Sequence, residues 1–158
     1  MTEREIAKIV KVILSEQISI KITLDIANAL IEKVRQKAIE MNVNVVIAVA
    51  DNSGNPIAVQ CMDEAYIASF DIAVHKAFTS VGLKMSTHQL GILSQPNQPL
   101  YGIQYTNDGK IVIFGGGEPL RINEKIIGAI GVSGGSVEQD TALAAFGKEV
   151  FKEVAAWQ

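Results

Sequence analysis

The residue types that could do chemistry gather on one predicted helix, at about residues 69–81. Asp71 and His75 are four residues apart, so they share one face of that helix. His75 could be a metal or haem ligand whose imidazole Asp71 orients, or the two could form an ordinary surface pair. Lys76 and Thr79 lie near His75 on the same helix. Lys76 stands among apolar residues, where it is either partly buried or extends its stem to water.

Two glycine-rich stretches offer backbone amides to an anion. Residues 115–117 are three consecutive glycines, which indicates a close approach of the backbone to a ligand or to another segment. Residues 131–135, GVSGG, match the Gly-x-Ser-x-Gly pattern of a nucleophile elbow between a predicted strand and a predicted helix. Both histidines precede Ser133, however, and a tight turn whose Ser136 caps the last helix explains the small residues better. Neither stretch fits a P-loop or a dinucleotide-binding fingerprint.

The remaining polar residues fit no familiar metal or catalytic site. Two histidines and one cysteine, Cys61, leave no credible zinc cluster and no internal disulfide. Five carboxylates fall at strand ends or in loops, and the sequence assigns acid and base roles to no pair of them. They are Asp51, Asp63, Glu64, Glu118 and Asp140.

The elements that must position these residues are distinguished by their hydrophobic period. Apolar residues at helical spacing predict helices at 3–17, 23–41, 69–81, 88–93 and 137–156, with Thr23, Ser86 or Thr87, and Ser136 as caps. β-branched and apolar runs predict five strands. These are Val43–Ala50, Pro56–Met62, Lys110–Phe114, Pro119–Ile122 and Lys125–Val132. The order favours one α+β domain over residues 1–158, with an antiparallel sheet covered by helices.

Composition limits the class of protein. The chain has 158 residues, 48% of them hydrophobic and 20% charged, with a net charge of −3. These values exclude a disordered protein and disfavour a dedicated nucleic-acid binder. Glu3 and Glu5 stand where a signal peptide would be basic, and no apolar run approaches the roughly 20 residues of a spanning helix. We therefore expect a cytoplasmic protein that binds neither a membrane nor nucleic acid.

Four segments of the chain together resemble one protein family: VVIAVADNSGNPIAVQCMDEA, AVHKAFTS, FGGGEPL and IIGAIGVSGGSVEQD. It is the family of GlcG, the haem-binding protein HbpS and the C-terminal domain of PduO-type proteins, and the resemblance runs from about Thr23 to the C-terminus. It implies a profilin-like fold, a five-stranded antiparallel sheet flanked by helices in α/β/α layers. It also implies a homo-oligomer, from a dimer up to an octamer, and we expect the N-terminal helix, residues 1–20, in oligomer contacts.

Matching positions carry the family's motifs onto this chain. Asp51 and Gly54 match an Asp-x-x-Gly hairpin, Lys76 and Thr79 match a Lys-Ala-x-Thr helix, and residues 116–120 match a glycine–proline turn. Some members bind haem, and others are encoded with genes for glycolate, glycerol or propanediol use. The resemblance therefore implies a small-ligand-binding role for these positions.

Two departures from the family pattern concern the ligand. Cys61 replaces a common arginine, and Glu64 replaces a common glycine. In some haem-binding members an axial histidine comes from the N-terminal region, but residues 1–43 contain no histidine. His75, or no histidine at all, would have to take that place.

We expect the ligand, haem or a related tetrapyrrole or another small anion, in a cleft between the Lys76 helix and the turn at residues 115–120. Propionates would there meet Lys76 and free glycine amides. Two alternatives stay open. One is a non-catalytic accessory protein of glycolate, glycerol or diol metabolism. The other is an enzyme on a small oxygenated metabolite or haem, with Lys76 or a loop carboxylate as general base. The expected ligand-binding residues are Asp51, His75, Lys76, Thr79, Gly115, Gly116, Gly117, Glu118 and Pro119.

Overall fold

Four antiparallel strands form the sheet of this computed structural model, which describes residues 1–17 and 20–156. The spatial order is β2–β1–β4–β3. The bounds are β1 Val46–Asp51, β2 Pro56–Cys61, β3 Gly117–Ile122 and β4 Lys125–Ser133. Nearly all of β1 is buried, as its unbroken apolar run predicts, and it forms the expected hairpin with β2. The predicted antiparallel sheet is therefore confirmed.

The helices begin and end close to their predicted positions. They are α1 Glu3–Gln17, α2 Leu24–Glu40, α3 Ser69–Gly82, α4 Thr87–Leu93 and α5 Val137–Ala156. Thr23, Ser86 and Ser136 cap as predicted, because each hydroxyl accepts from the amide three residues on, at 3.1–3.2 Å. Two short 3₁₀ turns, Ile103–Tyr105 and Asn107–Gly109, follow α4.

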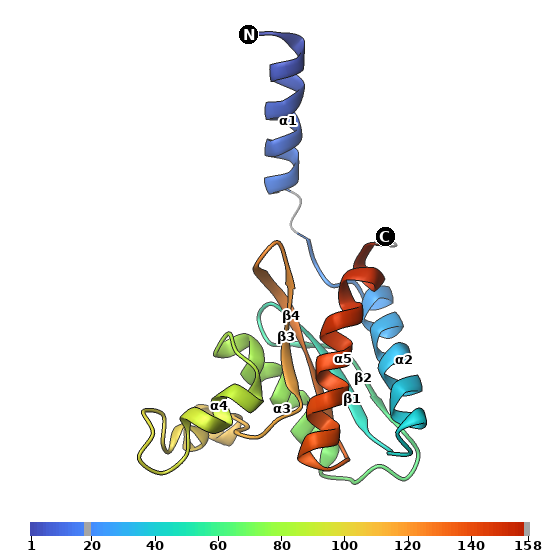
Figure 1. Cartoon of the computed structure of the whole chain (residues 1–158), viewed down its shortest axis with the longest axis vertical. Helices are drawn as coiled ribbons and strands as arrows, with labels where there is room; N and C mark the ends of the chain where they lie inside the picture. Colours follow the sequence, from blue (N-terminus) through green and yellow to red (C-terminus); the bar gives the residue numbers. More distant parts are fainter. Residues whose placement is uncertain (18–19, 157–158) are drawn as a thin grey trace.

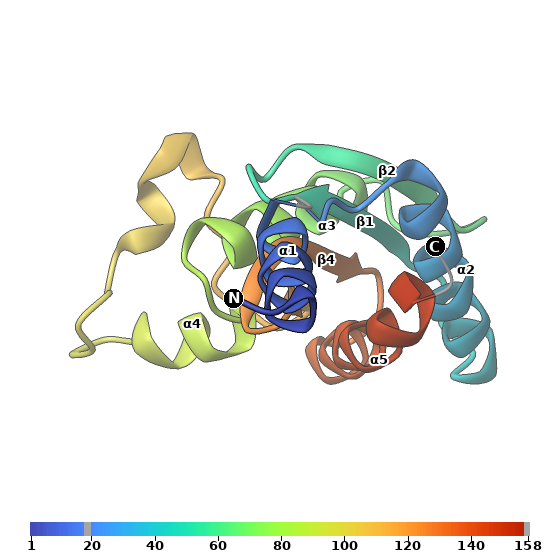
Figure 2. The same cartoon turned by 90° about the horizontal axis from the view of Figure 1, so that it is seen from above.

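Helices cover both faces of the sheet, as the expected α/β/α layering requires. Figure 1 shows α2 and α5 side by side, and their apolar residues pack with Ile47, Val49 and Ile130 of the sheet. The alternate residues of β1 face α3, where Ala48 packs against Ala73. Figure 2 shows α4 and the loop after it projecting to one side of these layers. The first helix, α1, stands away from the body (Figure 1).

The five-strand expectation is wrong by one strand, because Lys110–Phe114 does not join the sheet. This segment runs instead between α3 and α4. The amide of Val112 donates to Thr79 Oγ1 at 3.0 Å, a side-chain acceptor on α3. At Gly91 on α4 a Cβ would lie 2.5 Å from the carbonyl oxygen of Ile113. This β-branched segment thus makes its contacts with helices and not with a neighbouring strand. The sequence pattern of a strand does not distinguish these two cases.

Replacing Thr79 with valine should lower the free energy of unfolding by about 1–3 kcal/mol, because the buried amide of Val112 would lose its acceptor. Urea unfolding followed by circular dichroism measures this change. Thr106→Val is the matched control, since the Thr106 hydroxyl is exposed and donates to Ile103 at 2.6 Å. That control should stay within about 0.5 kcal/mol of the parent. Equal effects of the two substitutions would contradict the role given to Thr79.

Candidate functional site

A lysine buried in the protein interior organises the region where the sequence predicts a site. Lys76 is 0% exposed, and its Nζ donates to Asp140 Oδ2 at 2.9 Å and to the carbonyl oxygen of Val132 at 2.8 Å. Asp140 belongs to the first turn of α5, and its Oδ1 accepts from the amide of Gly135 at 2.9 Å. A single ion pair therefore joins α3, the end of β4 and the start of α5.

Small residues bring Lys76 to this position. Gly131 of β4 has no room for a side chain, because a Cβ there would lie 2.0 Å from the carbonyl oxygen of Ala73 and 2.8 Å from the amide of Ala77. With alanine on the helix and glycine on the strand, α3 lies directly against β4. The lysine stem then runs along the interior to the end of the strand, where the Val132 carbonyl accepts from it.

The surroundings of Lys76 change its ionisation. Burial away from water lowers the pKa of the ammonium below its ordinary value, while the charge and the hydrogen bond of Asp140 oppose that change. The buried ammonium donates to both Asp140 and Val132 and has no exposed surface. The expectation that Lys76 contacts a ligand propionate is therefore not met in this arrangement. A role as general base loses support for the same reason.

The glycine turn, residues 115–117, lies directly over this lysine. Gly116 has φ +117°, and a Cβ there would lie 2.6 Å from Lys76 Nζ and 2.6 Å from the carbonyl oxygen of Val132. The amide of Gly117 donates to Thr87 Oγ1 at 2.8 Å. Among the residues that the structure describes, the amides of Gly115 and Gly116 donate to no acceptor. The turn is therefore buried and closely packed, with two amides that have no acceptor among the described residues.

An aromatic ring borders the same turn. Phe114 lies with its ring centroid 4.9 Å from Lys76 Nζ, a cation–π contact, and 41% of the residue is exposed. An exposed ring beside two free amides provides an apolar surface and hydrogen-bond donors together. The sequence reasoning missed Phe114, and its place directly before three glycines was the available signal.

Of the two histidines, His88 lies against this turn, and His75 stands next to Lys76 on α3. His75 is half-buried on α3, one helical turn before Thr79, whose hydroxyl donates to the His75 carbonyl at 2.7 Å. Since Thr79 faces the segment leading to Phe114, His75 lies on the same side of α3. His88 is exposed, and a Cβ at Gly115 would lie 3.5 Å from the His88 Cβ. Within the described residues, His, Cys, Asp and Glu form no group of three suited to a metal ion.

Three other predicted ligand residues lie in structural contacts. Glu118 forms an ion pair with Lys148 at 3.0 Å, and Pro119 is buried in β3 opposite Ala129. Asp51 accepts from the amides in its own hairpin turn at 2.8 and 3.0 Å. It pairs with Gly128, so it lies about 13 Å along β4 from Val132. The structure thus gathers Lys76, Thr79 and the glycine turn, places His75 on the same helix, and leaves Asp51 apart.

The Gly-x-Ser-x-Gly match is a strand ending, as the tight-turn interpretation expects. Ser133 is the last residue of β4 and is 4% exposed, and its hydroxyl lies 3.2 Å from that of Ser69. Gly134 has φ +145° and starts the turn into α5. Neither the position nor the partner of Ser133 is that of a nucleophile.

A family model described as haem degrading protein HbpS-like matches residues 22–149, which include every residue of this region. This chain belongs to the HbpS-like family. A relative from Citrobacter freundii, an uncharacterised 15.0 kDa protein encoded between dhaT and dhaS, is 47% identical over 140 residues. That match covers 89% of this chain and 98% of the relative.

Solved structures of other proteins of this kind share the HbpS-like fold. The Klebsiella pneumoniae protein ORFY is 48% identical with a TM-score of 0.80, over 82% of this chain and 90% of that one. A complex of PduOC with haem is 37% identical with a TM-score of 0.74, over 76% of this chain and 87% of that one. Within the described residues, no helix is long and apolar enough to cross a membrane.

Proposed function

We propose that this HbpS-like chain binds a tetrapyrrole, with haem as the first ligand to test, at the glycine turn beside Phe114. The observation that carries the proposal is the pair of unpartnered amides at Gly115 and Gly116 next to a ring that is 41% exposed. Carboxylates bind well to free backbone amides, and a macrocycle needs an apolar surface on which to lie. The similarity to the PduOC–haem complex supports this choice of ligand.

The residues at the turn fit such a ligand. In the proposal, Gly115 and Gly116 hold a propionate, Phe114 contacts the macrocycle, and His75 supplies an axial nitrogen from α3. Lys76 acts as a positioning residue, since its Nζ donates to the Val132 carbonyl and lies directly beneath Gly116. Bound haem would bring a redox-active iron to this edge of the protein. Assembly as a homo-oligomer, from a dimer up to an octamer, and a cytoplasmic location stay predictions from the sequence.

Titration of the purified protein with haem should give a saturable Soret shift at one haem per chain. His75→Ala should weaken binding at least about tenfold, since one lost iron–nitrogen bond is worth more than roughly 1.4 kcal/mol. His88→Ala is the matched variant, because His88 is the other histidine of the chain and lies beside the same turn. It should bind haem as the parent does. Absorbance spectra and apparent dissociation constants of the three proteins provide the comparison.

Each other outcome changes the proposal in a defined way. Loss of binding in His88→Ala alone would keep haem and transfer the axial role to His88. Absence of a saturable shift in the parent would overturn the haem assignment. A parallel titration with hydroxocobalamin tests the corrinoid member of the tetrapyrrole class, and a saturable shift there alone would replace haem by a corrinoid.

A further inference from the structure

The first helix presents an apolar face that nothing in the described part of the chain covers. Ile6, Ile9, Val10 and Ile13 are each 44–48% exposed, and α1 stands away from the body (Figure 1). These four positions follow the spacing i, i+3, i+4, i+7, which is the pattern by which an amphipathic helix anchors in a groove. Such a face is costly to leave in water.

Local sequence signals favour this helix, although its apolar face stays exposed within the described residues. Thr2 and Glu5 form a capping box, in which the Thr2 amide donates to Glu5 at 2.7 Å and the Glu5 amide donates to Thr2 Oγ1 at 3.3 Å. A helix of only 15 residues is nevertheless marginal in water without tertiary contacts. Its stability therefore depends on contacts made outside the described chain.

The helix is also an addition to the family domain. The HbpS-like match begins at Ile22, which leaves all of α1 outside it. The Citrobacter freundii relative is covered to 98% of its length by an alignment that takes in 89% of this chain. A relative is thus nearly complete without a segment of this size, and the HbpS-like domain match does not include α1.

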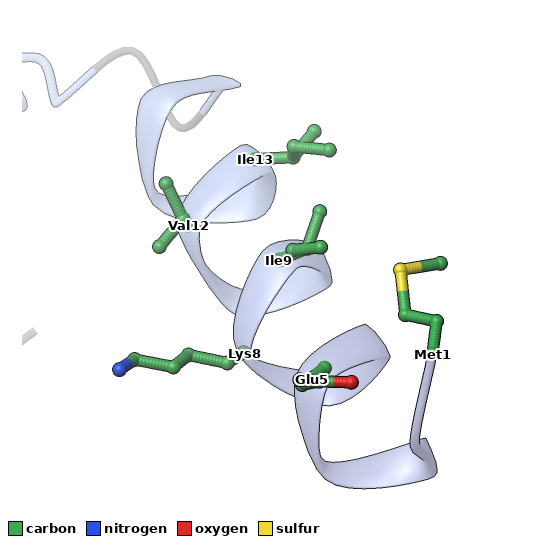
Figure 3. Close-up of a pocket in the computed structure, with 6 residues that line it drawn as sticks. All are labelled: Met1, Glu5, Lys8, Ile9, Val12 and Ile13. Carbon is green, nitrogen blue, oxygen red and sulfur yellow. The ribbon is translucent and has the colours of Figure 1, made fainter.

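The charged residues of α1 between positions 3 and 11 lie in three places, which are the two acidic edges of the apolar face and a basic face opposite it. Glu3 lies beside Ile6 and Val10 at one edge of the apolar face, and Glu5 lies beside Ile9 at the other. Arg4, Lys8 and Lys11 share the opposite face by the same helical spacing. Figure 3 shows Ile9 and Ile13 pointing to one side of the helix while Lys8 points away from them.

A surface hollow of about 520 Å³ lies at the Glu5 edge of the apolar face, where it takes in Ile9 and Ile13 (Figure 3). Among the described residues, its lining comes from one helix and its N-terminus: Met1, Glu5, Lys8, Ile9, Val12 and Ile13. Ile9 and Ile13 are thus open on this side to a second surface.

The charges disfavour two of the possible occupants. A second copy of α1 packed in parallel would bring acidic edges against acidic edges. In either direction, about two heptads are short of the three to four that a stable coiled coil needs. A lipid surface suits helices with basic residues beside the apolar face and aromatic anchors, whereas here Glu3 and Glu5 border that face and residues 1–13 contain no aromatic.

We propose that α1 is a docking helix for another protein, whose binding site is an apolar groove rimmed by Lys and Arg side chains. The four branched side chains fill the groove, and the rim pairs with Glu3 and Glu5. Arg4 and Lys11 on the opposite face stay in water, and Lys8 lies at the edge of the hollow. This function is separate from ligand binding, so either one can fail while the other holds.

Site-specific photo-crosslinking in the full chain identifies the partner. A benzophenone side chain replaces Ile9 on the apolar face or, as a control, Lys11 on the opposite face. Crosslinking is carried out in cells that make the protein, and the crosslinked peptide is mapped by mass spectrometry. The captured protein is then purified. We expect crosslinks from position 9 only, to an apolar groove flanked by basic residues.

The purified partner is then titrated against the full chain. The combined substitution Ile9→Glu and Ile13→Glu keeps good helix formers and should weaken binding by about 30-fold or more, as loss of central anchors does. Lys11→Glu, the matched control, should change binding by less than about threefold. Haem titration of the same variants should match the parent, which keeps this test independent of the ligand proposal.

Three outcomes would overturn the proposal. Crosslinks to a second copy, with a smaller oligomer in the Ile9→Glu, Ile13→Glu variant, would make α1 an oligomer contact. Flotation of the full chain with anionic phosphatidylserine vesicles, lost in the same variant, would make it a lipid anchor. A captured protein that does not bind saturably after purification, or whose binding is unchanged in the variant, would leave α1 without a docking role.

Discussion

Replacing Lys76 with methionine is expected to lower the free energy of unfolding by about 3–5 kcal/mol, because the Asp140 carboxylate would stay buried without its cation. Methionine keeps most of the apolar stem, so the loss of charge is the main change. The glycine turn would also lose the group beneath Gly116, and haem binding should weaken with it. Urea unfolding of the parent and the variant measures the change in stability.

A surface ion pair provides the control for Lys76. Lys148→Met removes the partner of Glu118, but the Lys148 side chain is 51% exposed, so the expected change is about 0–1 kcal/mol. The double variant Lys76→Met, Asp140→Leu removes both buried charges and should recover part of the stability that the single variant loses. The recovery is partial because the Gly135 amide and the Val132 carbonyl lose their side-chain partners. If Lys76→Met unfolded within 1 kcal/mol of the parent, the buried pair would not support the turn as described.

Replacing Gly131 with alanine is expected to lower the free energy of unfolding about as much as the Lys76 substitution does. The loss should reach or exceed the top of the roughly 1–3 kcal/mol range for overpacking. The new methyl group would meet the Ala73 carbonyl oxygen and the Ala77 amide, which are main-chain atoms of α3 and cannot rotate away. The helix would have to move off β4, and that movement would withdraw Lys76 from Val132 and Asp140. Thermal unfolding and haem titration should therefore change together.

The matched control for Gly131 lies on the same helix that the substitution displaces. At Gly82, the last residue of α3, a Cβ would meet nothing within 4 Å. Gly82→Ala should be neutral, or stabilising by up to about 1 kcal/mol, because alanine favours the helix. Equal melting temperatures for Gly131→Ala and the parent would show that α3 and β4 are less tightly packed than the structure indicates.

Local chemistry made most of the fold predictable from the sequence. Thr23, Ser86 and Ser136 mark where their helices begin. Capping is a local contact, because the hydroxyl accepts from an amide only three residues further along the chain. The β1–β2 hairpin follows from turn residues between two apolar runs. The prediction of a strand at Lys110–Phe114 was wrong because the amide of Val112 donates to Thr79, which lies 33 residues earlier in the chain. No local pattern carries that information.

The candidate site was predictable in its residues but not in their roles. Lys76, Thr79 and the three glycines were identified, yet the partner of Lys76 appeared only as one of several loop carboxylates. Lys76 and Asp140 are 64 residues apart, so their pairing depends on the close approach of α3 to β4 at Gly131. An open cleft under the turn was expected, and the structure instead fills the space beneath the turn with the lysine itself.

The sequence separation of the Lys76–Asp140 pair also bears on how the protein folds. Closing a loop of that length has an entropic cost that local contacts must first offset, so distant contacts of this kind tend to form late. The pair needs α3 on one face of the sheet and the start of α5 at the end of β4, so both must be in place before the ammonium can leave water. A partly folded chain would therefore lack the supported glycine turn, and the haem binding proposed there would report only chains whose folding is complete.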